Sequence, residues 1–134
     1  MREFKFRVWS IEEKQFISPN ILEVFDESGD LTAFKYIKTG KLNPLYMPVE
    51  NYIIQQYTGL TDKNKKEIYE GDILDFTARY KQTGPVEVIY YGASFGCVIT
   101  DDGGLKEFWN LSHIVQQHYP EIIGNIFENK QLLN

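Results

Sequence analysis

Apolar and charged residues alternate strictly at the start of the chain, from Glu3 to Trp9. Successive side chains of a strand point to opposite faces, so Phe4, Phe6 and Val8 share one face. Trp9 falls on the other face, together with the charged residues. The pattern predicts a half-buried strand with an exposed Trp9, which makes Trp9 an interface candidate.

Two apolar segments follow, at 21–25 and 31–37, and a polar run with one glycine joins them at 26–30. This arrangement is typical of a β-hairpin. Residues 40–48 contain two prolines and predict an irregular connection. Residues 53–58 fit a helical face or a strand equally well, and Thr58-Gly59 is expected to end either element.

From Gly71 onward, apolar segments recur about every 10 to 15 residues with turn residues between them. This rhythm predicts a strongly bent antiparallel sheet or barrel. A short helical turn is expected at 111–115 with Ser112 as its cap, and Gly124 is expected to mark a β-bulge. The predicted strands are 73–80, 86–91, 97–100, 105–109 and 121–127.

The fold class expected from these patterns is mainly β with little helix. Residues 1–134 are expected to form one cooperative unit, because no linker rich in proline, glycine or serine divides them. Within that unit, residues 1–50 are an N-terminal β segment and residues 51–134 are the barrel-like part.

Composition narrows the function classes. The chain has 134 residues, 15% of them aromatic, a net charge of −5 and one cysteine, Cys97. These values argue against disorder, a disulfide scaffold and bulk attraction to nucleic acid. No apolar run approaches the roughly 20 residues that span a bilayer, and no apolar segment of a signal peptide is found near the N-terminus. The expected location is the cytoplasm, with no membrane partner.

The run 92–96 matches G-x-S-x-G, the nucleophile elbow, around Ser94. That motif needs a strained turn from a strand into a helix. Residues 97–100 are instead strand-like, which favours a plain connection between strands. A serine hydrolase is therefore the least favoured hypothesis, and no catalytic residue is assigned. In such a hydrolase, the partners of Ser94 in the Ser–Asp–His order would be Asp101 or Asp102 and then His113 or His118.

No metal or cofactor is predicted. The spacing of Asp62, Asn64 and Glu67 faintly resembles a calcium loop, but Glu67 stands where that loop needs glycine. The two histidines and Cys97 lack the spacing of a zinc site. Cys97 lies in an apolar strand and is expected to be an inert, buried thiol.

The only concentration of cations suggests a second hypothesis, a small barrel that binds nucleic acid through a basic and aromatic groove. Acidic residues interleave with these cations and cancel much of their field, which counts against phosphate binding. The candidate residues are Lys63, Lys65, Lys66, Arg79 and Tyr80.

Three blocks in the chain resemble the YopX-like family of phage and prophage proteins. Residues 1–9 are similar to an MREIKFRAW-type opening, and residues 57–73 to a YTGLKDKNGKEIYEGDIV-type signature. Residues 122–129 are similar to an IGNIYEN-type close. Lys65 replaces the usual glycine of the central block, and Lys130 stands where the family often has proline.

The resemblance implies a phage or prophage origin, expression in the bacterial cytoplasm, and a later part like a small SH3-type barrel. It supplies no activity, cofactor or catalytic residue. The shared residues also have a structural explanation, since glycines suit turns, isoleucines suit the core and aspartates suit turn hydrogen bonds. These residues are Gly59, Gly71, Ile68, Ile73, Ile126, Asp62 and Asp72.

The favoured hypothesis is a non-enzymatic accessory protein that acts through protein contacts and self-associates. The high aromatic content, the expected exposure of Trp9 and the lack of a convincing catalytic constellation support it. Host or phage proteins and a second copy of the chain are the expected partners.

Overall fold

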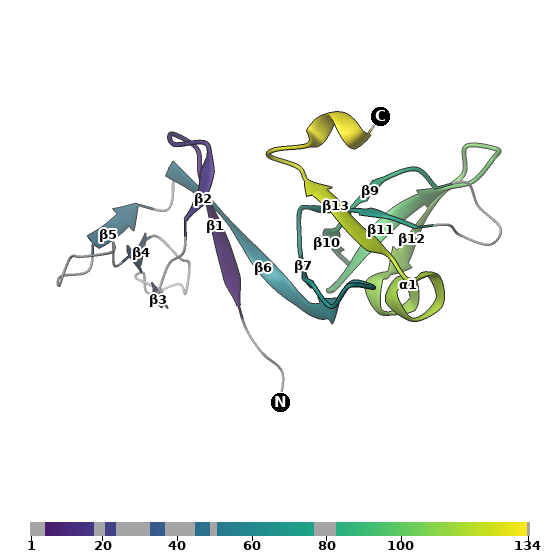
Figure 1. The fold of residues 1–134 in the computed structure, drawn as a ribbon, viewed down its shortest axis with the longest axis horizontal. Helices are drawn as coiled ribbons and strands as arrows, with labels where there is room; N and C mark the ends of the chain where they lie inside the picture. Colours follow the sequence, from purple (N-terminus) through teal and green to yellow (C-terminus); the bar gives the residue numbers. More distant parts are fainter. Residues whose placement is uncertain are drawn as a thin grey trace. The chain divides into compact units, whose positions relative to one another are not determined.

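The computed structural model describes residues 5–17, 21–23, 33–36, 45–48, 51–76 and 83–133. The chain divides into two compact units, Phe6–Gln55 and Met1–Lys5 with Gln56–Asn134 (Figure 1). The division falls at residue 55 rather than at the expected residue 50. Residues 51–55 belong with the first unit because Ile11 N–H donates to the Asn51 carbonyl at 3.2 Å and Arg7 Nε donates to Gln55 Oε1 at 2.7 Å. That the units unfold together stays a prediction.

The N-terminal unit contains short antiparallel strands. β1 (Phe6–Ser10) pairs with β2 (Gln15–Ile17) and lies beside the beginning of β6 (Tyr52–Thr61). A second sheet contains β3 (Ile21–Glu23), β4 (Ala33–Tyr36) and β5 (Leu45–Pro48). The pairing of β3 with β4 confirms the predicted hairpin.

The irregular connection expected at 40–48 is wrong for its second half, which forms β5 and pairs with β4. β5 is an edge strand, and Pro48 is its last residue. An edge strand tolerates proline because one side of its backbone has no neighbour to receive a hydrogen bond.

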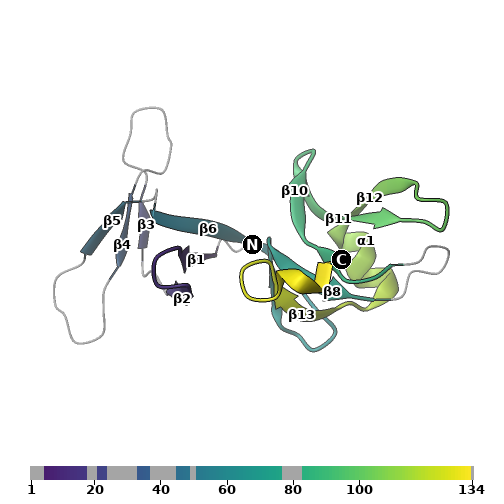
Figure 2. The same ribbon diagram turned by 90° about the horizontal axis from the view of Figure 1, so that it is seen from above.

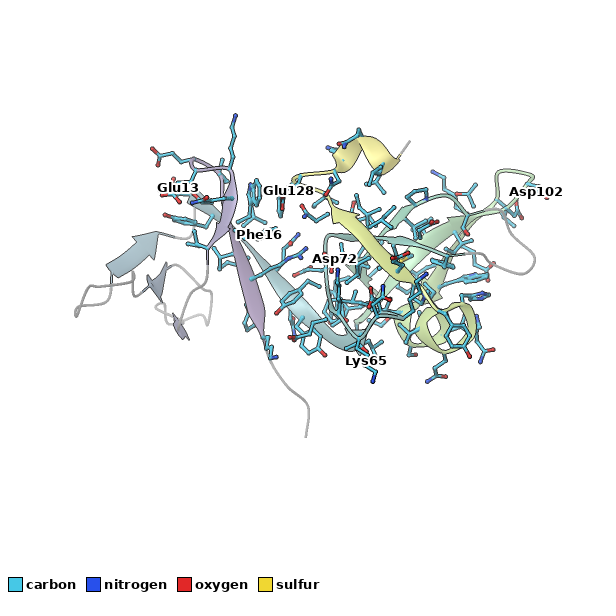
Figure 3. The ribbon with its side chains drawn as sticks, in the orientation of Figure 1. Glu13, Phe16, Lys65, Asp72, Asp102 and Glu128 are labelled. Carbon is cyan, nitrogen blue, oxygen red and sulfur yellow. The ribbon has the colours of Figure 1, made fainter. Side chains whose placement is uncertain are left out.

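Trp9 is buried, with 9% of its surface exposed, so its expected exposure is wrong. Its partner in the β1–β2 register is Phe16, which Figure 3 labels, and the two rings meet edge to face with 5.0 Å between their centroids. This cross-strand pair covers the indole. On the predicted core face Val8 is fully buried, whereas Phe6 is 40% exposed.

The C-terminal unit is built from two three-stranded antiparallel sheets (Figure 2). One has the order β13-β8-β9 and the other β10-β11-β12. The end of β6 pairs with β7. The elements are β7 (Glu67–Tyr69), β8 (Asp72–Asp75), β9 (Val86–Glu87), β10 (Ile89–Tyr91), β11 (Ser94–Thr100), β12 (Lys106–Asn110), α1 (Leu111–His118), β13 (Glu121–Asn125) and the 3-10 turn η2 (Lys130–Leu133).

The mainly β prediction is confirmed, with a curled antiparallel sheet and one α-helix among the described residues. The SH3-like form of the barrel stays a prediction. The helix begins at Leu111 as expected, but Asn110 caps it instead of Ser112. Asn110 Oδ1 accepts hydrogen bonds from both the N–H and the hydroxyl of Ser112, at 2.9 and 2.7 Å. The predicted bulge at Gly124 is confirmed by a register shift in β13.

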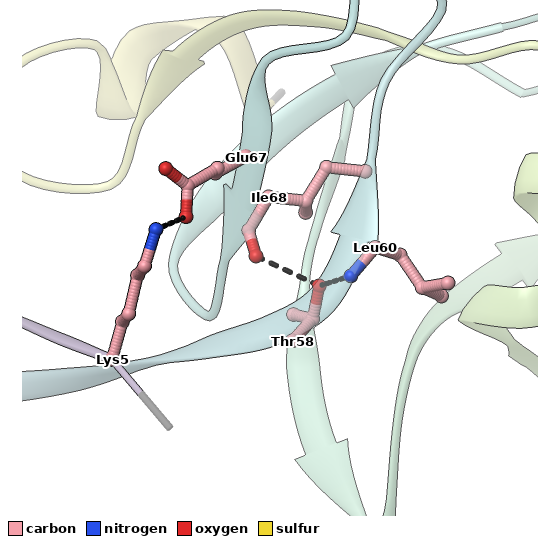
Figure 4. Close-up of polar contacts among 5 residues, drawn as sticks. All are labelled: Lys5, Thr58, Leu60, Glu67 and Ile68. Atoms are coloured by element: carbon pink, nitrogen blue, oxygen red, sulfur yellow. Dashed lines mark hydrogen bonds and ion pairs between the residues drawn. The ribbon is translucent and has the colours of Figure 1, made fainter. Parts of the chain in front are cut away.

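β6 is a strand, and it continues through Thr58-Gly59, where an end was expected. The chain passes this point in a bulge, with Gly59 at a φ of 86° that favours glycine. The hydroxyl of Thr58 donates to the Ile68 carbonyl at 2.7 Å and accepts from Leu60 N–H at 3.2 Å (Figure 4). This hydroxyl replaces the backbone pairing that the bulge interrupts.

The core of the C-terminal unit lies between its strands and α1. Its buried members come from β7, from β8 and the residue after it, from the residue between β9 and β10, from β11 and from α1. They are Ile68, Leu74, Phe76, Val88, Cys97, Ile99, Leu111 and Ile114.

Candidate functional site

Asp62 is a structural residue of the loop between β6 and β7. Its Oδ1 accepts hydrogen bonds from the N–H groups of Asn64 and Lys66 at 2.8 and 2.9 Å, and its Oδ2 accepts one from Ile122 at 3.0 Å. Burial alone would raise the pKa of Asp62, but these bonds and the charge of Lys66 hold it below its usual value. Both oxygens are engaged, which agrees with the preference for a turn over a calcium loop.

The lysine loop, Lys63–Lys66, brings three of the five nucleic-acid candidates together. Lys65 has a φ of 65° at the position where the resembled family has glycine, and its side chain is exposed (Figure 3). Lys63 Nζ lies 3.3 Å from Glu121 Oε2, which offsets part of the positive charge. Arg79 and Tyr80 lie outside the described residues.

Ser94 does not lie in a nucleophile elbow. Gly92 and Ala93 have φ angles of 58° and 63° and form a two-residue hairpin turn between β10 and β11. Ser94 therefore opens a strand, and its hydroxyl donates to the Tyr91 carbonyl at 3.5 Å. Among the described residues this hydroxyl has no hydrogen bond to a histidine, so the geometry provides it with no general base.

The two histidines belong to an aromatic cluster at the helix. His118 stacks on Trp109 with 5.3 Å between ring centroids, and His113 meets the edge of Trp109 at 5.3 Å. The two imidazoles lie 5.6 Å apart, and Phe76 lies 5.7 Å from His118. In the part of the chain that the structure describes, no three potential metal ligands come together.

Asp101 and Asp102 belong to the predicted tight turn before β12. Asp101 Oδ1 accepts hydrogen bonds from the N–H groups of Gly103 and Leu105, at 3.0 and 2.8 Å, which closes the turn. Asp102 is exposed at its tip (Figure 3). Asp101 therefore has a structural explanation that needs no catalytic role.

Cys97 is fully buried in β11, as expected. Burial, aided by the charge of Glu87, raises the pKa of its thiol to about 12. A thiol with such a pKa carries almost no thiolate near neutral pH, which makes it a poor nucleophile.

The opposite face of the same strand is open to solvent. Cys97 and Ile99 point into the core, so Val98 and Thr100 point away from it. Residues opposite each other in the register share a face. Ile89 and Tyr91 from β10, and Lys106 and Phe108 from β12, therefore join them through the pairs that each strand makes with β11. We call this surface the β10–β12 face: Ile89, Tyr91, Val98, Thr100, Lys106 and Phe108.

Aromatic groups dominate one end of the β10–β12 face. The rings of Tyr91 and Phe108 lie 5.4 Å apart, and Tyr91 is 65% exposed. Phe108 lies over Gly96, where a Cβ would collide with the ring and with the Trp109 carbonyl. The missing side chain at Gly96 thus makes room for the ring of Phe108.

A groove borders the other end of the face. It encloses about 530 Å³, between the face and the segment that leads into β9. Its apolar walls include Val86, Ile89 and Val98, and its charged residues are Glu87 and Lys106. The remaining lining residues are Thr83, Gly84, Pro85, Thr100 and Leu133.

The sequence profile described as YopX protein matches residues 5–134. The chain belongs to the YopX family. No curated protein matches the chain. A solved structure, the crystal structure of protein EF1440 from Enterococcus faecalis, is similar at 29% sequence identity and a TM-score of 0.66, with all of both chains covered. Among the residues that the structure describes, no helix has the length and hydropathy that crossing a bilayer requires.

Sequence reasoning missed the β10–β12 face of this YopX-family chain, although two signals mark it. Tyr90-Tyr91 and Phe108-Trp109 are adjacent aromatic pairs, and a strand must point the two members of such a pair to opposite faces. The apolar run Cys97–Ile99 likewise sends its middle residue outward. Each pattern predicts an exposed apolar side chain once the segment is known to be a strand.

Proposed function

We propose that this YopX-family chain is a non-enzymatic accessory protein of a phage or prophage, that it acts in the bacterial cytoplasm through protein–protein contacts, and that it self-associates. One observation supports the contacts above all others, namely the contact between the exposed Tyr91 ring and the half-buried Phe108 ring on the β10–β12 face. Tyrosine and phenylalanine offer large apolar areas at low entropic cost, and they are enriched where proteins meet.

Neighbouring side chains extend this apolar surface. Val98 is 39% exposed and lies beside Phe108 in the register, and Ile89 lies on the same face across β11. Contiguous apolar patches of this kind mark interaction sites more often than isolated exposed residues do. The proposed contact surface therefore differs from the expected one, since Trp9 is buried against Phe16.

Nucleic-acid binding through the lysine loop is the alternative against which this proposal is tested. Lys65 and Lys66 are exposed, which favours it, whereas Lys63 is close to Glu121. A titration with short single and double strands at low salt separates the two functions. Binding that weakens steeply with salt and is lost in Lys65→Glu would favour nucleic acid.

The protein-contact proposal is tested by affinity capture from host cells with paired variants. The wild-type chain and Asp102→Asn, which alters an exposed turn, are expected to retain the same proteins. The double variant Tyr91→Ser, Phe108→Ser is expected to lose them. Equal retention by the double variant, or retention of nucleic acid alone, would contradict the proposal.

A further inference from the structure

The groove beside the β10–β12 face combines apolar walls with a carboxylate. Val86, Ile89, Val98 and Leu133 supply aliphatic surface, and Glu87 is the only acidic residue among the described residues that line the groove. Its volume of about 530 Å³ lies within the range of roughly 300–1,000 Å³ that is typical of ligand sites. The groove can therefore receive a few side chains of a partner.

Glu87 has unused binding capacity. Its side chain is half-buried, and it makes no hydrogen bond or ion pair with the residues that the structure describes. Burial raises the pKa of Glu87, and the charge of Lys130 opposes this from beyond ion-pair distance. A carboxylate that has lost part of its water and gained no donor is a favourable partner for an incoming cation.

We propose that this groove binds a segment of a partner protein in which an arginine or lysine stands beside aliphatic residues. The cation pairs with the Glu87 carboxylate, and the aliphatic side chains pack on Ile89 and Val98. The proposal deepens the function proposed above and rests on it, because it takes the β10–β12 face to be a protein-binding surface.

Charge also orients such a segment. Glu87 lies on β9 in one sheet, whereas Lys106 lies on β12, an edge strand of the other sheet. A basic side chain is attracted at the β9 side and repelled at the β12 side. A segment with an acidic side chain in its place would bind more weakly, because its charge would be brought next to the like charge of Glu87.

The test uses fluorescence anisotropy with the full chain and two labelled peptides. One carries isoleucine-arginine-isoleucine between glycines, and the other has glutamate in place of the arginine. The arginine peptide is expected to bind the wild-type chain and Asp102→Asn equally, since Asp102 lies outside the groove. Glu87→Gln is expected to weaken binding about tenfold or more through loss of a charge-assisted hydrogen bond, and Val98→Ser severalfold.

Three results would overturn the inference: no binding of the arginine peptide, equal binding of the glutamate peptide, or equal affinity of Glu87→Gln and the wild-type chain. None of them would overturn the proposed function, which depends on Tyr91 and Phe108. If the double variant at those positions still captures every partner, the proposed function fails instead. Thermal unfolding of each variant confirms that it remains folded.

Discussion

The block at 57–73 and the β10–β12 face differ in how they use their side chains. The block contains the most specific part of the family signature, yet Thr58, Asp62 and Asp72 all hydrogen bond to the backbone of their own unit. The face carries no motif, yet it presents the exposed ring of Tyr91, and the groove beside it holds a carboxylate without a hydrogen-bond partner in the described structure. The recognisable sequence therefore builds the scaffold, and ordinary strand sequence supplies the surface available for binding.

Removal of the Asp62 carboxylate is expected to have the largest effect. Asp62→Ala loses three hydrogen bonds and leaves three N–H groups without their acceptor. We expect the free energy of unfolding to fall by about 3 kcal/mol or more. Denaturant unfolding measures this change in free energy, with Asp102→Ala, a substitution of an exposed residue, as the control. A loss no larger than that of the control would contradict the structural role of the block.

Substitution of Gly96 is expected to perturb the face from within the strand. Gly96→Ala places a methyl group against the Phe108 ring and the Trp109 carbonyl, so β12 must shift. Overpacking of this kind costs about 2 kcal/mol. Gly84→Ala is a matched control, because nothing lies within 4 Å of its added Cβ. Equal stability of the two variants would mean that Phe108 moves aside easily.

Low pH is expected to lower the stability of the fold through protonation of Asp62 in the block at 57–73. The folded pKa of Asp62 lies below its unfolded value, so its stabilisation is complete above about pH 4 and is lost as the pH falls through the folded pKa. Asp62→Asn lacks this contribution. The stability of the wild-type chain should therefore fall more steeply than that of Asp62→Asn below about pH 4. If denaturant unfolding gave the same pH dependence of stability for the wild-type chain and Asp62→Asn, the result would be inconsistent with the lowered pKa of Asp62.

Glu87 is expected to affect the pH dependence of stability in the opposite direction. Its folded pKa lies above its unfolded value, so ionisation destabilises the fold as the pH rises past the unfolded pKa, and the penalty is complete at neutral pH. Glu87→Gln should then be as stable as the wild-type chain or more stable, by less than about 1 kcal/mol because water screens the half-buried group. A clear loss of stability in denaturant unfolding would show that Glu87 supports the fold.

Strand alternation predicted the mainly β class and the hairpin of β3 and β4, because both depend on local patterns. It could not predict that β6 passes through Gly59, since Thr58 and Ile68 meet only after the chain has folded back. It failed at Trp9 for a similar reason, because the covering ring of Phe16 comes from another strand.

The candidate site was harder to predict than the fold. Ser94 was a candidate because residues 92–96 match a motif, and the lysine loop was a candidate because cations are concentrated there. Both are features of the local sequence. The β10–β12 face arises from the register of three strands, which brings Tyr91 and Phe108 together across β11. No spacing within one segment encodes that contact.

Sedimentation velocity across micromolar concentrations tests the central claim most directly, namely that the chain makes protein contacts, including contacts with a second copy, through the β10–β12 face. The wild-type chain and Lys65→Glu are expected to associate as concentration rises, while Tyr91→Ser remains monomeric. A wild-type chain that stays monomeric at high micromolar concentration, or a Tyr91→Ser variant that associates like the wild type, would contradict the account.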